Sequence, residues 1–257
     1  MRTHTHKKTL GALALASVLP MAAQAATVTW DGDAADGLWD TATNWDGDTV
    51  PGAGDDVIIS NGDTVTGTTF NGNYTVTLSG NSTLADGGVW RAGTTTVTVE
   101  SGSTLGSGGF WDLNNATLNF KDGAAVNMGF WEHKNTNVFN FELGAAGFTT
   151  LTPGNLTEGA PPAITTTYSV DMANYTGGTG VIDLVDFGGD STGLTNAIFT
   201  GGGQYVLAVN NAGSYTAALQ WDDATDKVQL NITAVPEPSS AALLGLGGLA
   251  LILRRRK

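Results

Sequence analysis

A short repeat runs through the middle of this chain and limits what it can fold into. Three tryptophans, Trp90, Trp111 and Trp131, follow one another at nearly equal spacing. Around them are short segments in which apolar residues alternate with polar ones, and equivalent apolar residues recur at a constant step of 21. This is the pattern of half-buried strands joined by glycine-rich turns. These apolar residues form two series, one of Val76, Val97, Leu118 and Phe139 and one of Leu78, Val99, Phe120 and Phe141.

A period of this length, with no helical segment in the repeat, is typical of one coil of a parallel β-helix. We therefore predict an all-β fold, a right-handed parallel β-helix or β-solenoid with about 20–21 residues per coil. Successive coils would stack about 4.8 Å apart, so each apolar series would become an internal ladder. The alternative is a β-sandwich, because short strands at even spacing also suit two packed sheets.

Composition divides the chain into six segments. Residues 1–25 have the charged, apolar and small-residue order of a signal peptide, with Ala23, Ala25 and Ala26 around the cleavage site. The pattern of the C-terminal β region fits either further coils or a small antiparallel sheet. After the signal peptide come an N-terminal cap (26–54), the β-solenoid repeats (55–151), a proline-rich loop (152–163), the C-terminal β region (164–233) and a tail (234–257).

The segment before the repeats differs from them in composition. Residues 27–54 contain Trp30, Trp39 and Trp45 among aspartates and glycines, which predicts a cap over the first coil. The pattern W…W…NW…VPG…DD in this segment resembles the N-terminal part of exported bacterial β-strand-repeat proteins of the autotransporter-passenger type.

The cap also contains a candidate cation site, formed by Asp31, Asp33 and Asp36. An EF-hand loop has acids at positions 1, 3 and 5 and a glutamate at position 12. Here the third acid, Asp36, stands at position 6 and Ala42 at position 12, so the EF-hand pattern fails. The remaining choices are a looser Ca²⁺ site and a solvated turn, and we predict no other cofactor.

The charge of the exported part is strongly negative. Residues 26–233 contain 23 acidic residues and four cations, Arg91, Lys121, Lys134 and Lys227, for a net charge near −19. Nucleic-acid binding requires clustered lysine and arginine, so this surface excludes a nucleic-acid partner.

The residues after the three tryptophans are candidates for polar chemistry. Arg91, Asp112 and Glu132 occupy equivalent positions, and carboxylates about 5 Å apart on neighbouring coils would be compatible with a retaining glycosidase pair. The other interpretation is a surface ion ladder, because repeats place charges in register. His133 is the one histidine after the signal peptide, and no nucleophile motif accompanies it, so we predict that the protein is not an enzyme.

The tryptophans themselves have two interpretations. If Trp90, Trp111 and Trp131 face outward, they form an aromatic strip on which sugar rings could stack beside Asp112 and Glu132. If they face inward, they are part of the core, which we favour because a large exposed apolar strip is costly.

The tail has a distinctive order of residues. Val235, Pro236, Glu237 and Pro238 precede an apolar stretch, 241–253, which as a helix would be about 20 Å long, shorter than a hydrocarbon core of about 30 Å. A basic cluster, Arg254, Arg255, Arg256 and Lys257, follows and would stay on the cytoplasmic side.

This tail is similar to the sorting tail of PEP-CTERM proteins. The resemblance implies secretion, transient membrane anchoring through a short transmembrane helix, and processing near Pro-Glu-Pro by an exosortase in a Gram-negative bacterium. Members are commonly surface or extracellular-matrix proteins made alongside exopolysaccharide. We therefore expect an exported structural or adhesive protein, the alternative being a carbohydrate-binding or polysaccharide-cleaving β-helix protein.

Overall fold

The computed structural model describes most of the chain between the predicted signal peptide and the tail. The signal peptide, apart from Ala25, and the tail beyond Val235 lie outside the described residues. Within the described residues the regular structure is β-strand, apart from a short 3₁₀ helix, η1 (Ala42–Asn44). The prediction of an all-β fold is confirmed. The described ranges are 25–67, 71–86, 89–106, 110–127, 129–158, 165–188 and 205–235.

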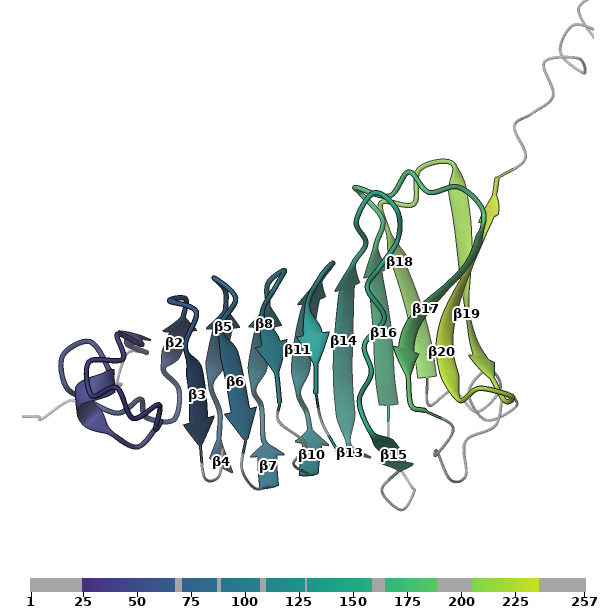
Figure 1. Ribbon diagram of the computed structural model, residues 1–257. Coiled ribbons are helices and arrows are strands. Elements are labelled where there is room, and N and C mark those ends of the chain that lie inside the picture. The colour runs from purple at the N-terminus through teal and green to yellow at the C-terminus, as the bar shows by residue number, and fades with distance from the viewer. Residues whose placement is uncertain are drawn as a thin grey trace, which may run out of the picture.

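Three parallel sheets make up most of the molecule (Figure 1). The eight-stranded sheet contains, in spatial order, β1 (Thr27–Thr29), β2 (Asp56–Ile59), β5 (Thr75–Leu78), β8 (Thr96–Val99), β11 (Thr117–Lys121), β14 (Thr136–Glu142), β16 (Thr165–Asp171) and β18 (Tyr205–Asn210). The five-stranded sheet contains β15 (Asn155–Glu158), β13 (Phe130–Lys134), β10 (Phe110–Asn114), β7 (Val89–Ala92) and β4 (Asn71–Gly72). The four-stranded sheet contains β12 (Ala125–Val126), β9 (Thr104–Leu105), β6 (Thr83–Asp86) and β3 (Thr64–Gly67).

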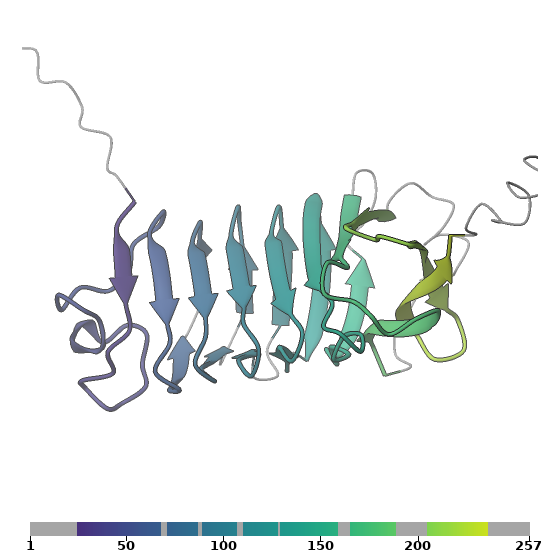
Figure 2. The same ribbon diagram turned by 90° about the horizontal axis from the view of Figure 1, so that it is seen from above.

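The chain visits these sheets in a fixed order. From β2 to β13 it passes from the eight-stranded sheet to the four-stranded sheet, then to the five-stranded sheet, and back. Each such passage, called a circuit below, pairs in parallel with the circuits before and after it, so the strands lie in a row along one axis (Figures 1 and 2).

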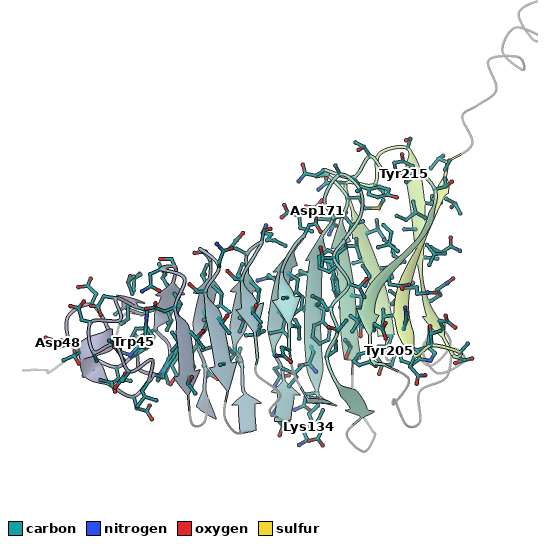
Figure 3. All side chains as sticks on the ribbon, viewed as in Figure 1. Trp45, Asp48, Lys134, Asp171, Tyr205 and Tyr215 are labelled. Carbon is teal, nitrogen blue, oxygen red and sulfur yellow. The ribbon has the colours of Figure 1, made fainter. Side chains whose placement is uncertain are left out.

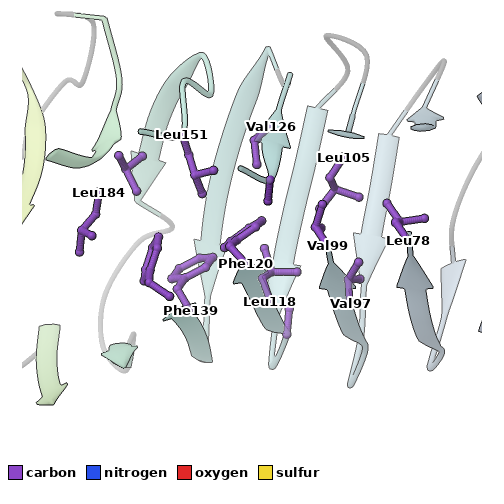
Figure 4. Close-up of a cluster of buried hydrophobic side chains, with 14 of the residues drawn as sticks. Leu78, Val97, Val99, Leu105, Leu118, Phe120, Val126, Phe139, Leu151 and Leu184 are labelled. Atoms are coloured by element: carbon purple, nitrogen blue, oxygen red, sulfur yellow. The ribbon is translucent and has the colours of Figure 1, made fainter. Parts of the chain in front are cut away.

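The two predicted apolar ladders are confirmed. Val97 pairs with Val76 and Leu118, and Phe120 pairs with Val99 and Phe141. All eight ladder side chains are at most 1% exposed. Figure 4 shows several of them stacked between the strands, together with Leu105, Val126 and Leu151. The regular step from one circuit to the next therefore places like side chains above one another in the core.

The step between paired residues is not constant along the whole chain. Asp56 pairs with Thr75, a step of 19, whereas Thr136 pairs with Thr165, a step of 29. In β2, β14 and β16 every second residue is buried despite these differences. Extra residues therefore fall between strands, where they do not change which side chains face inward.

A tight turn between neighbouring circuits requires glycine. Gly80 has a φ of +63°, and a Cβ atom there would collide with the carbonyl oxygen of Ser60 in the preceding circuit. A side chain would therefore push apart two stacked turns as well as strain the backbone.

The C-terminal β region combines both arrangements that its pattern allowed. β16 and β18 extend the eight-stranded parallel sheet. Beyond them, β17 (Gly180–Asp186), β20 (Lys227–Ala234) and β19 (Tyr215–Asp222) form a three-stranded antiparallel sheet, with β20 in the centre. Its buried residues, such as Leu184 and Leu230, belong to the same continuous core as the ladders.

The N-terminal segment occupies strand edges at the other end. β1 pairs with β2 and so forms the end of the eight-stranded sheet. Residues 37–39 lie along β3, where Trp39 N donates to Thr66 O at 3.0 Å and Thr66 N donates to Gly37 O at 2.7 Å. Because unpaired edges invite association with other chains, this covering of two sheets suits a cap.

Candidate functional site

The three repeat tryptophans are aligned, as their spacing predicted. Trp111 of β10 pairs with Trp90 of β7 and with Trp131 of β13. Their side chains lie outside the described part of the structure, as do those of Arg91 and His133. The choice between an exposed sugar-binding strip and a packed core therefore stays a prediction.

The candidate carboxylates lie on neighbouring strands and share a cation. Asp112 pairs with Glu132 in the backbone register, and Arg91 pairs with Asp112. Lys134 Nζ lies 2.9 Å from Asp112 Oδ2 and 3.0 Å from Glu132 Oε2. Lys134 was not predicted as a partner, although it stands two residues after Glu132 and so on the same face of β13. The ammonium group contacts one oxygen of each carboxylate, as an ion ladder requires, and the choice between such a ladder and a catalytic pair stays a prediction.

Both carboxylates affect the pKa of Lys134. The hydrogen bond to Asp112, followed by the one to Glu132, raises the pKa of Lys134 above its ordinary value of 10.5. Because the pKa of Lys134 is raised, its contacts stabilise the fold fully below the ordinary lysine pKa. This stabilisation disappears as the pH rises through the pKa of Lys134 in the folded protein. The lysine side chain is 41% exposed, whereas those of Asp112 and Glu132 are 14% and 21% exposed, so solvent screens these contacts only in part.

We predict that Asp112→Asn and Glu132→Gln each change the free energy of unfolding by less than about 1 kcal/mol. The pKa of Lys134, measured by NMR titration of its side chain, should fall more in Asp112→Asn than in Glu132→Gln, because the Asp112 contact has the larger effect. Loss of a measurable glycan-cleaving activity in either variant, with the fold intact, would instead identify a catalytic pair.

The cap aspartates point to different partners. Asp36 accepts hydrogen bonds from Leu38 N at 2.9 Å, Thr41 Oγ1 at 2.7 Å and Asn44 Nδ2 at 2.6 Å. Asp31 Oδ1 accepts from the backbone of Asp33 at 3.2 Å. Among the residues of the described ranges, no group of three or more histidine, cysteine, aspartate or glutamate side chains is arranged to hold a metal ion. Asp36 acts instead as a local hydrogen-bond acceptor in the cap.

Asn44 holds this acceptor in the cap, a role that was not predicted from the sequence. Its side chain is fully buried, accepts a hydrogen bond from Ala34 N at 3.0 Å, and donates to Asp36 and to Leu38 O. The available signal was the Asn44-Trp45 pair of the cap pattern. An asparagine that is buried beside a tryptophan needs hydrogen-bond partners for both its carbonyl and its amino group.

Cap stability should depend on acid pH through Asp36. Its hydrogen bond from Leu38, then those from Thr41 and Asn44, lower its pKa below the ordinary 3.8. A lowered carboxyl pKa stabilises the fold above the ordinary value and stops doing so as the pH falls through the folded value. Asp36→Ala should therefore be less stable than the parent at neutral pH, and the difference should shrink between about pH 4 and pH 2.

Urea unfolding of the parent and Asp36→Ala over this pH range would measure the effect, with Asp33→Ala as the control in the same segment. A difference that stayed constant down to the acid end of the range would show that the charge of Asp36 does not matter.

A polar groove on the outer face of the eight-stranded sheet was not foreseen. It has a volume of about 390 Å³ and crosses β8, β11, β14, β16 and β18. One row of side chains along it consists of Thr98, Asn119, Asn140 and Ser169, which pair successively in the backbone register. A second row consists of Lys121, Glu142 and Asp171.

Hydrogen bonds between neighbouring circuits fix these rows. Asn119 Nδ2 donates to Thr98 Oγ1 at 3.0 Å, and Asn140 Nδ2 donates to Asn119 Oδ1 at 2.7 Å. Lys121 binds Glu142, which raises the pKa of the lysine. The hydrogen bond from Asn211, with one from Ala173 N, lowers the pKa of Asp171. The groove thus presents oriented amides, hydroxyls and charged groups, which are groups that hydrogen-bond sugars or other polar ligands.

The last strand of the body runs into the tail. Residues 234–257 match the family model described as the PEP-CTERM protein-sorting motif. The chain carries a PEP-CTERM sorting motif. This motif implies an exported protein that is anchored transiently in the membrane and then processed by an exosortase. No curated protein and no solved structure matches this chain. The autotransporter-type resemblance of the cap stays a prediction.

The structure places only part of the sorting signal. Val235 is described, whereas Pro236, Glu237, Pro238 and the basic residues Arg254, Arg255 and Arg256 lie outside the described residues. So does the predicted transmembrane helix, and across the described ranges no helix is long and apolar enough to cross a membrane. At the predicted signal cleavage site, Ala23 is also outside, while Ala26 N donates to Asp55 Oδ1 at 3.1 Å.

Proposed function

We propose that this protein is a structural or adhesive component of the surface or extracellular matrix of a Gram-negative bacterium, without enzymatic activity. Its body is a right-handed β-solenoid in this proposal, with the three parallel sheets as its faces. The observation that carries the proposal is a PEP-CTERM motif attached to a repetitive body whose strands pair continuously from β1 to β18.

The architecture of the body supports a scaffold role. Each circuit is hydrogen-bonded to the next, and apolar ladders run through the interior, so the rod resists bending. The N-terminal segment and the three-stranded sheet stand at the two ends of the row (Figure 1). Covered ends oppose stacking of copies end to end, so contacts with a matrix would use the faces.

Glycan binding by the groove is the second candidate function. It is favoured by the row of oriented amides and hydroxyls from Thr98 to Ser169, which would follow a linear polysaccharide along the axis. The groove also holds Glu142 and Asp171 beside the single cation Lys121, in a body with a net charge near −19. A neutral or amino-bearing exopolysaccharide is therefore a better partner than an acidic one.

Two measurements test the proposal. In the producing bacterium, the full chain should be found at the surface or in the matrix. A chain that lacks residues 236–257 should remain folded but should no longer be anchored in the membrane and processed there. A glycan-binding and hydrolysis screen on residues 26–235 would then separate the functions. Turnover of a glycan would overturn the proposal. Glycan binding that is lost in Asn140→Ala would establish the second candidate. The absence of both turnover and binding would support the structural role.

A further inference from the structure

The folded body and the sorting motif overlap. β20 ends at Ala234, which pairs with Tyr215 of β19, whereas the motif begins at residue 234. Val235 N also donates to Ser214 O at 2.8 Å. The first two residues of the motif are therefore held in the three-stranded sheet, and no free linker separates the body from Pro236.

The connection from this point to the apolar stretch is short. Only residues 236–240 lie between Val235 and Ala241. A fully extended chain spans at most about 3.3–3.6 Å per residue, so the connection reaches about 20 Å. When the apolar stretch is in a bilayer, the end of the body that carries Val235 must stay within that distance of it.

The segments of the body that lie nearest the tail contain no charged side chain. We define the tail-proximal end as residues 172–180, 211–216 and 233–235, which are the loop after β16, the β18–β19 turn with the start of β19, and the end of β20. These three segments include no aspartate, glutamate, lysine, arginine or histidine, although residues 26–233 contain 23 acidic residues. Asp171 borders this surface as a charged residue, and its Oδ1 accepts hydrogen bonds from Asn211 Nδ2 and Ala173 N, both at 2.9 Å.

The opposite end of the same sheet is acidic. The turn between β19 and β20 contains Asp222, Asp223 and Asp226, with Asp186 at the end of β17 and Lys227 as the one cation. Figure 3 shows Tyr215 at the end of this sheet from which the tail leaves. Charge is therefore distributed unevenly along the three-stranded sheet. The end from which the tail leaves is neutral, and the end with the β19–β20 turn is negative.

Exposed side chains at the neutral end suit a lipid headgroup region. Val235 is 42% exposed, and Val181, next to Gly180, is 51% exposed. Tyr215 is half-buried and packs edge-to-face on the buried Tyr175, with ring centres 5.6 Å apart. Neutral, partly apolar surfaces with tyrosine are tolerated near bilayer interfaces, while carboxylates are repelled by anionic headgroups.

We propose that the tail-proximal end is a membrane-facing surface, which lies against the headgroups of the bilayer that holds the tail. The three-stranded sheet then stands with its acidic turn pointing away from that bilayer. This inference rests on the proposed function, because it requires insertion of the tail. It assigns a lipid surface as the partner of the neutral end before processing releases the body.

Single labels on the full chain test this orientation. The chain has no native cysteine, so Ser214→Cys labels the tail-proximal end and Ala224→Cys, also exposed, labels the acidic turn. The length of β20 separates these positions by about 25 Å. Each labelled protein is reconstituted into vesicles of phosphatidylethanolamine and phosphatidylglycerol that carry an acceptor dye on the headgroups.

Energy transfer to the headgroup dye should be high from position 214 and much lower from position 224. Equal transfer from the two positions, in protein that floats with the vesicles, would overturn the inference while leaving the tail-anchoring function intact. Failure of the full chain to float with vesicles would instead contradict the proposed function.

A charge variant tests the role of neutrality. Thr179→Glu adds a negative charge to the tail-proximal end, and Ala224→Glu adds the same charge to the acidic turn, both at exposed positions. Transfer from a label at 214 should fall in Thr179→Glu and stay unchanged in Ala224→Glu. Unchanged transfer in both variants would show that the end lies near the membrane without contacting headgroups, which contradicts the proposal.

Discussion

Replacing Phe120 with alanine is expected to lower the free energy of unfolding by about 3–5 kcal/mol. The phenyl ring is 1% exposed and lies 5.8 Å, centre to centre, from the ring of Phe141 in the next circuit. Val99 pairs with Phe120 on the other side. Because backbone hydrogen bonds fix the spacing of these strands, the neighbours cannot close over the cavity that alanine leaves.

Asn119→Ala is the matched control, one residue earlier on the same strand. Its side chain faces the polar groove, and its loss removes two hydrogen bonds, so a cost of about 1–2 kcal/mol is expected. Urea unfolding would compare midpoints, provided that the slopes agree. Similar losses at positions 119 and 120 would mean that the strand does not keep its inward and outward faces.

The core ladders could be predicted because two constraints coincide in them. A strand alternates its side chains, and stacked strands repeat at one spacing, so the constant step from Val97 to Leu118 fixes both facing and neighbour. Residues outside this regular part gave less information. The alternating pattern of β20 is the same for parallel and antiparallel pairing, so it could not show that β20 and its partner β17 leave the parallel sheets.

The groove and the contacts of Lys134 illustrate another limit. Ser169 pairs with Asn140 across a longer step than the period that the sequence displays, because the proline-rich segment is inserted between them. Lys134 was counted as a surface charge, yet it bridges Asp112 and Glu132 because its long side chain reaches back along its own strand and across to the next. Side-chain reach and irregular loop lengths are not encoded in a period.

Trp45→Ala is the second change with a large expected effect, again about 3–5 kcal/mol. The indole is fully buried, with ring centres 4.9 Å from Trp30 and 4.6 Å from Trp39, and its Nε1 donates to Trp39 O at 2.7 Å. Alanine would leave a cavity and a buried carbonyl without its donor, so the cost exceeds that of lost area alone.

Loss of Trp45 should also change how the protein associates. Trp39 and its neighbours lie along β3, so a loosened cap would expose the edge of the four-stranded sheet to other chains. Urea unfolding should show the lower stability, and light scattering should show association that rises with protein concentration. Leu38→Ala is the control, because this cap side chain is 46% exposed and its removal should change stability by less than about 0.5 kcal/mol. If Trp45→Ala matched Leu38→Ala in both measurements, the cap would not be what protects this end of the sheets.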